Sequence, residues 1–559
     1  MNRSGPPSHR RSPAPGERPP RALSVDRASV VPLRSPRIHF DRVNERHALA
    51  QIRFPDLSSD ALHRRFALQF LIRSWPNGQQ HFGSFHRRPR SLRGRSNDCI
   101  AIQPTARDHY MAYPDRGKRT NDVRSRETRH SDSERVVVIP ATISIKSLAC
   151  VRSLGRHGVR TIVASEFETP PAAHSRYCDE LVAIPSPHED LLAYKDALVS
   201  LAARPDVWTI VPTREEVAYL LSKHRAEFAE HVAVGWPTFE SLRTVHDGYR
   251  LAEHAADVGV PVPETRLLTE ISDWNPDYIV KQRYSILTPD YADFLGPREC
   301  KWNGVEPIYL ESGVEPDIDA IVGTMLGEVP VVQEVVRGTE YSFRALYDHG
   351  TPVATSLRRQ VRGKTYAGGA SVFRELTRDP ALEELARRLL DSLDWHGVAT
   401  VQFIKNEETD ETTLVEINPR IWSSISLDIR AGADFPYHYW LMTRGESTYI
   451  DSTHRTDVAT HLLFGELQYL RSVLRDDFPN VDRPTFRQAI ADVGLSVWHH
   501  PHFDFLCLDD PIPFVRTVID TFFEQISEPT ATGAQDWSWT SVRDIVDVVV
   551  RRSWGQNEP

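Results

Sequence analysis

Residues Leu414–Trp422 of this chain read L-V-E-I-N-P-R-I-W. The alternation of apolar and polar residues predicts a β-strand in which Glu416 and Asn418 share one face. Pro419 ends the strand because proline has no backbone N–H to donate, and Arg420 follows directly. Carboxylate and amide oxygens beside an arginine suit Mg²⁺ bound to phosphate groups. The alternative is a strand that ends in an ordinary polar turn, so the rest of the chain must supply further parts of a site.

Charge is unevenly distributed over the 559 residues. Residues 1–134 hold 26 of the 67 Lys and Arg residues and 13 of the 76 Asp and Glu residues, a net charge of +13. The remainder holds 41 basic and 63 acidic residues, a net charge of −22, and few of the basic residues are lysines. Because an acidic, lysine-poor surface keeps a protein solvated in high salt, a halophilic source is a hypothesis.

Cysteine usage and hydropathy point to a cytoplasmic protein. The five cysteines are scattered and form no C-x-x-C pair, which predicts neither a disulfide framework nor a thiolate metal site. No apolar run approaches the roughly 20 residues that a membrane helix needs.

Residues 1–134 are rich in Arg, Pro and Ser and show only weak periodicity, so we expect a disordered basic head. Binding of nucleic acid or anionic lipid by this head is a less favoured alternative, because regular aromatic–basic interleaving is missing. A start assigned too far upstream, with Met111 nearer the true beginning, is a third reading.

Order is expected to begin at Arg135 with a parallel α/β unit. Apolar runs predict strands at Arg135–Pro140, Val159–Ala164, Leu181–Ile184 and Val207–Val211, with helices at Lys146–His157 and around His188–Ala203. The turn after Pro140 reads A-T-I-S and has no glycine, which argues against a dinucleotide-binding fingerprint. Thr213–Glu216, after the last of these strands, is interpreted as a helix cap rather than a ligand contact.

From Asp247 onwards the sequence predicts both helices and strands. A helix at Asp247–Asp257 is broken by Gly259–Pro263, and Tyr278–Lys281 is a short strand that ends in a lysine. Gln282–Pro307 is polar and irregular, as a mobile lid would be, and Lys364–Ala370 is expected to be a flexible loop. Further strands are expected at Val329–Val336, Glu340–Tyr347, Thr351–Arg358, His396–Ile404 and Thr412–Ile417, and helices at Pro380–Leu393, Phe435–Thr443 and Phe514–Ile526.

Residues 278–422 resemble an ATP-grasp ligase. Four pieces occur in the order of that family: I-V-K ending at Lys281, V-V-Q-E-V-V-R-G-T-E ending at Glu340, G-V-A-T-V-Q-F ending at Phe403, and E-I-N-P-R ending at Arg420. Together with W-H-G-V-A, these pieces are most similar to the carboxylate–amine ligase-like group. The resemblance implies an α/β protein with a pre-ATP-grasp domain (135–240), two α+β ATP-grasp lobes (241–450) and a helical C-terminal extension (451–559).

The resemblance also implies roles for single residues. Lys281 would hold the α- and β-phosphates of ATP and, with Arg420, serve the transfer of the phosphoryl group. The adenine would lie against the strand of Gln333, Glu334, Val335 and Val336, and Glu340 would accept the ribose hydroxyls. Mg²⁺, with Mn²⁺ as an alternative, would be held by Glu416, Asn418 and Gln402. The Gly368–Gly369 loop, with Arg358, Arg359 or Arg362, would line the phosphate or acid pocket, although these arginines suit solvated strand positions equally well.

Two positions depart from the family pattern. Gly248 follows Asp247 where members often have a lysine, and Arg250 is the cation nearest in sequence. Gln402 stands where members commonly have a metal-binding carboxylate, which should weaken a second Mg²⁺.

The sequence therefore suits three functions. The first is an ATP- and Mg²⁺-dependent ligase that joins a small carboxylate to an amine, with a homodimer as one option for its assembly. The second is a nucleotide-binding regulator or scaffold with weakened catalysis, and the third is nucleic-acid binding through the head. Zinc binding by His499, His500 and His502 is not favoured, and Met442, Trp537 and Trp539 are interpreted as core or dimer contacts.

Overall fold

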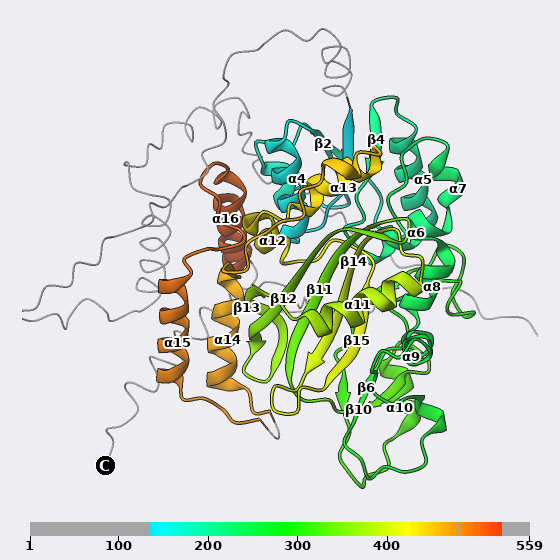
Figure 1. Ribbon diagram of the computed structural model, residues 1–559, viewed down its shortest axis with the longest axis vertical. Helices are drawn as coiled ribbons and strands as arrows, with labels where there is room; N and C mark the ends of the chain where they lie inside the picture. Colours follow the sequence, from blue (N-terminus) through cyan, green and yellow to red (C-terminus); the bar gives the residue numbers. More distant parts are fainter. Residues whose placement is uncertain (1–134, 303, 479–480, 528–559) are drawn as a thin grey trace, which may run out of the picture. The chain divides into compact units, whose positions relative to one another are not determined.

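The computed structural model describes residues 135–302, 304–478 and 481–527. The predictions for the basic head, for a start near Met111 and for Trp537 and Trp539 lie outside these residues. Figure 1 shows the order of the elements along the chain.

The N-terminal sheet is parallel, as the sequence predicts, with strand order β3-β2-β1-β4. Its strands are β1 (Val136–Pro140), β2 (Arg160–Ser165), β3 (Glu180–Ala183) and β4 (Val207–Ile210). Strand β1 is buried along its whole length because helices cover both faces of the sheet, which explains its uninterrupted apolar run. The order of the strands reverses between β1 and β4, and a crevice at the carboxyl ends of such strands is where open α/β sheets bind ligands.

Helices surround this sheet and lead away from it. They are α4 (Ile145–Arg156), η1 (Pro171–His174), α5 (Leu191–Ala202), α6 (Glu215–Lys223), α7 (Arg225–Ala229), α8 (Phe239–His246) and α9 (Gly248–Asp257). Asp247 caps α9 by accepting hydrogen bonds from the backbone N–H groups of Tyr249 (3.1 Å) and Arg250 (3.4 Å).

A small antiparallel sheet follows, in the order β5-β10-β6-β9. It consists of β5 (Thr265–Leu267), β6 (Tyr278–Lys281), β9 (Ile308–Tyr309) and β10 (Val331–Glu334), with η2 (Leu268–Glu270) and α10 (Ile318–Thr324) beside it. Leu268, Val280, Val332, Ile321 and Met325 form its own hydrophobic cluster.

Most of the described part of Gln282–Pro307 is irregular, as expected, but it contains two short strands and a buried cluster. Strands β7 (Ile286–Leu287) and β8 (Lys301–Trp302) pair within it, and Leu287, Ala292 and Leu295 form a buried cluster. A strand of two residues is too short to show an alternation of apolar and polar side chains in the sequence. The segment is stabilised by the burial of a few apolar side chains that lie apart in the sequence.

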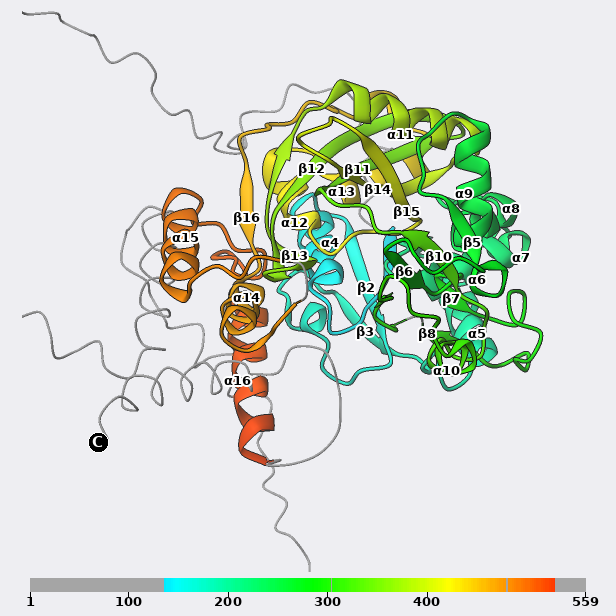
Figure 2. The ribbon, with the colours of Figure 1, turned by 90° about the horizontal axis from the view of Figure 1, so that it is seen from below.

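The largest sheet is antiparallel and has six strands in the order β15-β14-β11-β12-β13-β16 (Figure 2). These are β11 (Thr339–Asp348), β12 (Thr351–Thr365), β13 (Gly368–Thr377), β14 (Gly397–Lys405), β15 (Thr412–Asn418) and β16 (Ala459–His461). Helix α11 (Pro380–Ser392) covers one face, where Phe343, Val401 and Phe403 join the main hydrophobic core. Because neighbouring strand residues point to opposite faces, the other face carries the polar residues of these strands.

The expectation that Lys364–Ala370 is a flexible loop is wrong. Thr365 pairs with Gly368, so the segment is the tight turn between β12 and β13. Gly363 allows this close approach, because a Cβ there would lie 2.3 Å from the carbonyl oxygen of Gly368.

The C-terminal region consists of helices α12 (Ile425–Ala431), α13 (Phe435–Thr443), α14 (Leu463–Arg475), α15 (Phe486–His499) and α16 (Ile512–Ser527), with η3 (Ser447–Tyr449) after α13. Met442 is buried in the core, as one of its two readings predicts. None of the helices in the described ranges has the length and apolar character needed to cross a membrane.

Contacts join the parallel sheet to the six-stranded sheet. The backbone N–H of Ile421 donates to the carbonyl of Pro212 at 2.9 Å, and the hydroxyl of Tyr439 donates to the carbonyl of Ile210 at 2.9 Å. The segment after β15 is thereby held beside the carboxyl end of β4.

Candidate nucleotide and phosphate site

The structure places Glu416 and Asn418 on one face of β15, as predicted. The strand register sets Glu416 opposite Gln402 and Asn418 opposite Thr400 on β14. The Asn418 amide donates to Oε1 of Glu416 at 2.7 Å. These oxygens therefore form one polar surface at the end of two neighbouring strands.

Arg420 links this surface to the parallel sheet. Its Nη2 donates to Oδ1 of Asn418 at 2.8 Å, and its Nε lies 2.7 Å from Oε1 of Glu215 on α6. Restricted hydration raises the pKa of Glu416 even though its side chain faces an open cavity, while Asn418 and Arg420 act in the opposite direction. A cation bound at Glu416 would relieve this cost.

Lys281 approaches from β6, at the end of its strand as predicted. Its Nζ donates to Oε1 of Gln333 at 2.9 Å, and Nε2 of Gln333 donates to Oγ1 of Thr265 at 2.9 Å. Burial lowers the pKa of Lys281, and the nearby Glu416 opposes this shift. A half-buried lysine beside one carboxylate is suited to hold a phosphate as a point charge.

These side chains line one cavity of about 360 Å³, within the size range of small-molecule sites. Among the predicted residues it gathers Lys281, Gln333, Glu416, Asn418 and Arg420. The remaining wall is formed by Glu215, Val245, Gly248, Leu251, Gln282, Arg283, Ser285, Val305, Pro307, Val331 and Val415.

Five of the predicted residues do not line this cavity: Gln402, Glu334, Val335, Val336 and Glu340. Glu334 is exposed at the end of β10, and the backbone N–H of Val335 donates to the carbonyl of Asp277 at 2.9 Å, so this donor is already used. Glu340 forms an ion pair with Arg358 on the neighbouring strand.

Arg283, which sequence reasoning overlooked, places a cation beside Gly248. Arg283 lines the cavity and its Nη2 lies 2.8 Å from Oδ2 of Asp247. Arg250 is 45% exposed at its side chain and does not line the cavity. Gly248 leaves room for this arrangement, because a Cβ there would lie 3.2 Å from the carbonyl oxygen of Arg283.

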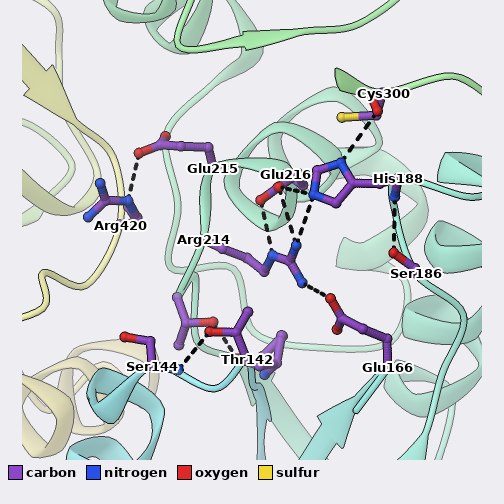
Figure 3. Close-up of polar contacts among 12 residues, drawn as sticks. Thr142, Ser144, Glu166, Ser186, His188, Arg214, Glu215, Glu216, Cys300 and Arg420 are labelled. Carbon is purple, nitrogen blue, oxygen red and sulfur yellow. Dashed lines mark hydrogen bonds and ion pairs between the residues drawn. The ribbon is translucent and has the colours of Figure 1, made fainter. Parts of the chain in front are cut away.

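A second group of charges lies at the carboxyl ends of the parallel strands (Figure 3). The Arg214 guanidinium contacts Glu166 (2.7 Å) and Glu216 (3.0 Å), and Nε2 of His188 lies 3.0 Å from Glu216. Burial opposes the charged form of Glu216, yet His188 and Arg214 hold its pKa well below the usual range.

The interpretation of Thr213–Glu216 as a helix cap is wrong. The Thr213 hydroxyl donates to the carbonyl of Pro140, and Arg214, at the N-cap position of α6, makes no side-chain cap hydrogen bond. Glu215 instead contacts Arg420 and lies 3.3 Å from Nε2 of His246.

Lys146, in the first turn of α4, faces these groups and was not singled out from the sequence. Burial lowers its pKa to about 7, Arg420 adds to this shift, and Glu215 and Glu216 oppose it. A lysine at a helix N-terminus also meets the positive end of the helix dipole. The charged form of Lys146 therefore lowers the stability of the folded protein.

Replacing Lys146 with methionine is expected to stabilise the protein by about 2 kcal/mol at pH 6, after allowance for partial exposure. Below pH 7 the lysine is charged in both states and the penalty is complete. Between pH 7 and 10.5 the folded state releases the proton first, so the penalty declines and the gain should fall below about 1 kcal/mol at pH 9.

Urea unfolding at both pH values measures this difference, with Lys364→Met as the control because the Lys364 side chain is 43% exposed. An equal gain at pH 6 and pH 9 would contradict the lowered pKa.

One signal in the sequence could have found Lys146, Arg214 and Glu215. The segments A-T-I-S-I-K and T-R-E-E both follow strands of a parallel sheet, and carboxyl ends of such strands converge where the strand order reverses.

The other residues proposed from the sequence for the acid pocket or for a metal site differ in their surroundings. Arg359 pairs with Glu375 (3.3 Å) and is 37% exposed at its side chain, whereas the Arg362 side chain is 10% exposed and pairs with Glu466 of α14 (2.7 Å). Histidines 499, 500 and 502 form no metal cluster among the described residues. Asp348, His349 and His396 do have ligand spacing, but the His396 ring accepts from the His349 backbone N–H (3.2 Å) and lies 3.1 Å from the carbonyl of Val234.

Comparisons with known proteins agree with this fold. Residues 328–462 match the model of a family described as ATP-grasp in the biosynthetic pathway with Ter operon. This match lies inside the region that the sequence predicts to be ATP-grasp and agrees with the predicted superfamily, and the predicted α/β fold class is confirmed. A search of curated proteins found no match.

Three solved structures illustrate the likeness. Rhizobium etli pyruvate carboxylase is 15% identical with a TM-score of 0.45, over 58% of this chain and 29% of that one. N5-carboxyaminoimidazole synthetase from Staphylococcus aureus is 14% identical with a TM-score of 0.43, over 58% and 80%. L-amino acid ligase from Bacillus licheniformis is 14% identical with a TM-score of 0.43, over 58% and 78%. The matched part thus spans under a third of the carboxylase chain. At these identities and TM-scores the activities of the three proteins are not assigned to this chain.

Proposed function

We propose that the protein is an ATP- and Mg²⁺-dependent ligase that joins a carboxylate to an amine. The observation that carries this proposal is the convergence of Lys281, Glu416, Asn418 and Arg420 on one cavity. The proposal also draws on the ATP-grasp family match.

The oxygen donors fit a Mg²⁺ ion. Glu416 supplies one negative charge, and Asn418 and Gln402 offer neutral amide oxygens on the same face. When bound, the ion would neutralise phosphate charge. Lys281 and Arg420 would orient the phosphates and hold the transferring group, because a permanent planar cation suits developing negative charge.

The reaction has two steps. A carboxylate oxygen of the acid attacks the γ-phosphorus of ATP, the bond to the β-phosphate oxygen breaks, and ADP leaves with the electron pair. The amine nitrogen then attacks the carbonyl carbon of the acyl-phosphate, phosphate leaves, and the nitrogen loses a proton. Positioning and charge neutralisation supply most of the catalysis.

A release assay for ADP, run over a panel of small acids and amines, tests the function. At least one acid should stimulate ADP release, and Arg420→Ala should lower that rate about 10²-fold, because a charge aimed at the transferring group is lost. Arg455→Ala, at a side chain 67% exposed, is the control and should match the wild type. Full activity in Arg420→Ala would show that the site is misplaced.

A nucleotide-binding regulator or scaffold is the second candidate. It is favoured by Gln402, which places a neutral amide directly opposite Glu416. ATP would then raise the melting temperature while no acid–amine pair releases ADP.

The other assignments stay proposals. They comprise Mn²⁺ as an alternative ion, a cytoplasmic location, a halophilic source and a homodimer. The adenine and ribose roles of Gln333, Glu334, Val335, Val336 and Glu340 are proposals as well.

A further inference from the structure

The polar face of the six-stranded sheet continues well beyond the metal and phosphate residues. The register extends the row of Glu416 and Gln402 to Ser342 on β11 and Arg358 on β12. With strands about 4.8 Å apart, the backbone of Arg358 lies roughly 14 Å from that of Glu416. The row therefore spans about the length of a small molecule with two charged ends, and its first residue, Glu416, lines the cavity.

Several buried donors on this face have no partner. The side chains of Arg344, Arg358 and Arg374 belong to residues that are 1%, 4% and 1% exposed, and each Nε is buried without a hydrogen bond. The hydroxyl oxygens of Thr400 and Thr460 are buried and unpaired as well. Because buried polar groups are almost always paired, these donors offer hydrogen bonds to a polar ligand on this face.

Three guanidinium groups lie near one another on this face: those of Arg344, Arg358 and Arg374. Burial, together with the neighbouring Arg358 and Arg344, lowers the pKa of Arg374 to about 9. Arg344 and Arg374 each have a fully buried counter-ion, Asp428 and Asp504. An anion would relieve the repulsion among the three guanidinium groups.

Arg358 differs from the other two arginines in its counter-ion. Its partner is Glu340, whose side chain is 29% exposed, and its remaining contacts are the Ser342 hydroxyl (2.5 Å) and Oε1 of Gln360 (3.3 Å). Glu340 is also the carboxylate expected to accept the ribose hydroxyls. It cannot serve both groups fully, so nucleotide binding competes with the ion pair.

We propose that Arg358 binds a second anionic group of the acid substrate, and that ATP frees Arg358 for this role by drawing Glu340 to the ribose. The acid is therefore a dicarboxylate or a phosphorylated carboxylic acid. Its reacting carboxylate faces Glu416 and Arg420, and its other anion lies toward Arg358. This inference rests on the proposed function and adds a substrate class and an order of binding, ATP before the acid.

Calorimetric titration of the full chain tests the subsite. The probes are succinate, for a dicarboxylate, and 3-phosphoglycerate, for a phosphorylated acid, each with Mg²⁺ and with or without a non-hydrolysable ATP analogue. In the wild type one probe should bind at least tenfold more tightly when the analogue is present, a typical size for coupled sites. The probe that binds identifies the second anion.

Two variants separate the subsite from a merely structural ion pair. Arg358→Gln should weaken the bound probe at least tenfold and leave the affinity for the analogue unchanged or higher. Glu340→Gln should let the probe bind without nucleotide as tightly as the wild type binds it with nucleotide. Arg359→Gln is the matched control, because Arg359 is the next residue and pairs at the surface with Glu375.

Failure of the subsite is distinguishable from failure of the ligase. If neither probe binds, or if Arg358→Gln binds it like the wild type, the subsite is wrong even when ADP release is observed. If nucleotide-coupled probe binding appears without ADP release for any acid–amine pair, the subsite stands and the ligase activity fails.

Discussion

Replacing Glu416 with alanine is expected to lower acid-dependent ADP formation by about 10³-fold. Glu416 is the single carboxylate among the proposed metal ligands, since Asn418 and Gln402 are neutral amides. Loss of its charge removes the interaction that would bind the ion, and a bound metal contributes several kcal/mol of charge stabilisation in phosphoryl transfer. About 4 kcal/mol corresponds to about three orders of magnitude in rate.

The comparison variant is Glu408→Ala, which removes an exposed carboxylate from the turn between β14 and β15. Its rate should equal that of the wild type. The two rates are measured with saturating acid and a range of Mg²⁺ concentrations. A Glu416→Ala enzyme that keeps even a third of the wild-type rate would remove Glu416 from the metal site.

Replacing Asp428 with alanine is expected to destabilise the protein by about 3–5 kcal/mol. Asp428 is fully buried on α12 and accepts hydrogen bonds from Ser356 (2.6 Å), Trp422 (2.7 Å) and Arg344. Its loss leaves the guanidinium of Arg344 buried without a counter-ion. Burial already lowers the pKa of Arg344 to about 10, and Asp428 opposes that shift.

Urea unfolding of the variant beside Asp457→Ala measures the effect. Asp457 also pairs with an arginine, Arg455, but its side chain is 73% exposed, so its loss should cost less than about 1 kcal/mol. Equal midpoints for the two variants would show that the buried pair contributes no more than a surface pair.

Long elements with a regular period were predictable from the sequence. Helix α11 has apolar side chains at helical spacing, begins after a capping Asp379 and was expected at Pro380–Leu393. The two strands that carry Gln402 and Glu416 were expected from their alternation. Both kinds of pattern are local, since one helix or strand determines which residues share its face.

The failures have a common physical cause. Residues 364–370 contain two glycines, which suit a loop and a tight hairpin turn equally well, and the pairing of β12 with β13 decided between them. Threonine is a common helix-capping residue, but the Thr213 hydroxyl donates its hydrogen bond to the carbonyl of Pro140, some 70 residues earlier in the chain. In both cases the composition of the segment suits two structures, and contacts outside that composition select one of them.

The sequence by itself determined that Glu416, Asn418 and Arg420 would stand together, because they are adjacent on one strand and its exit. Only the tertiary structure decided which charges they meet. Glu215 on α6 pairs with Arg420, and the charge of Arg420 also acts on Lys146 of α4. Arg358 lies in the row of Glu416 through the register of four strands. Ion pairs and strand registers join residues far apart in the chain, and their energies depend on burial that no local pattern contains.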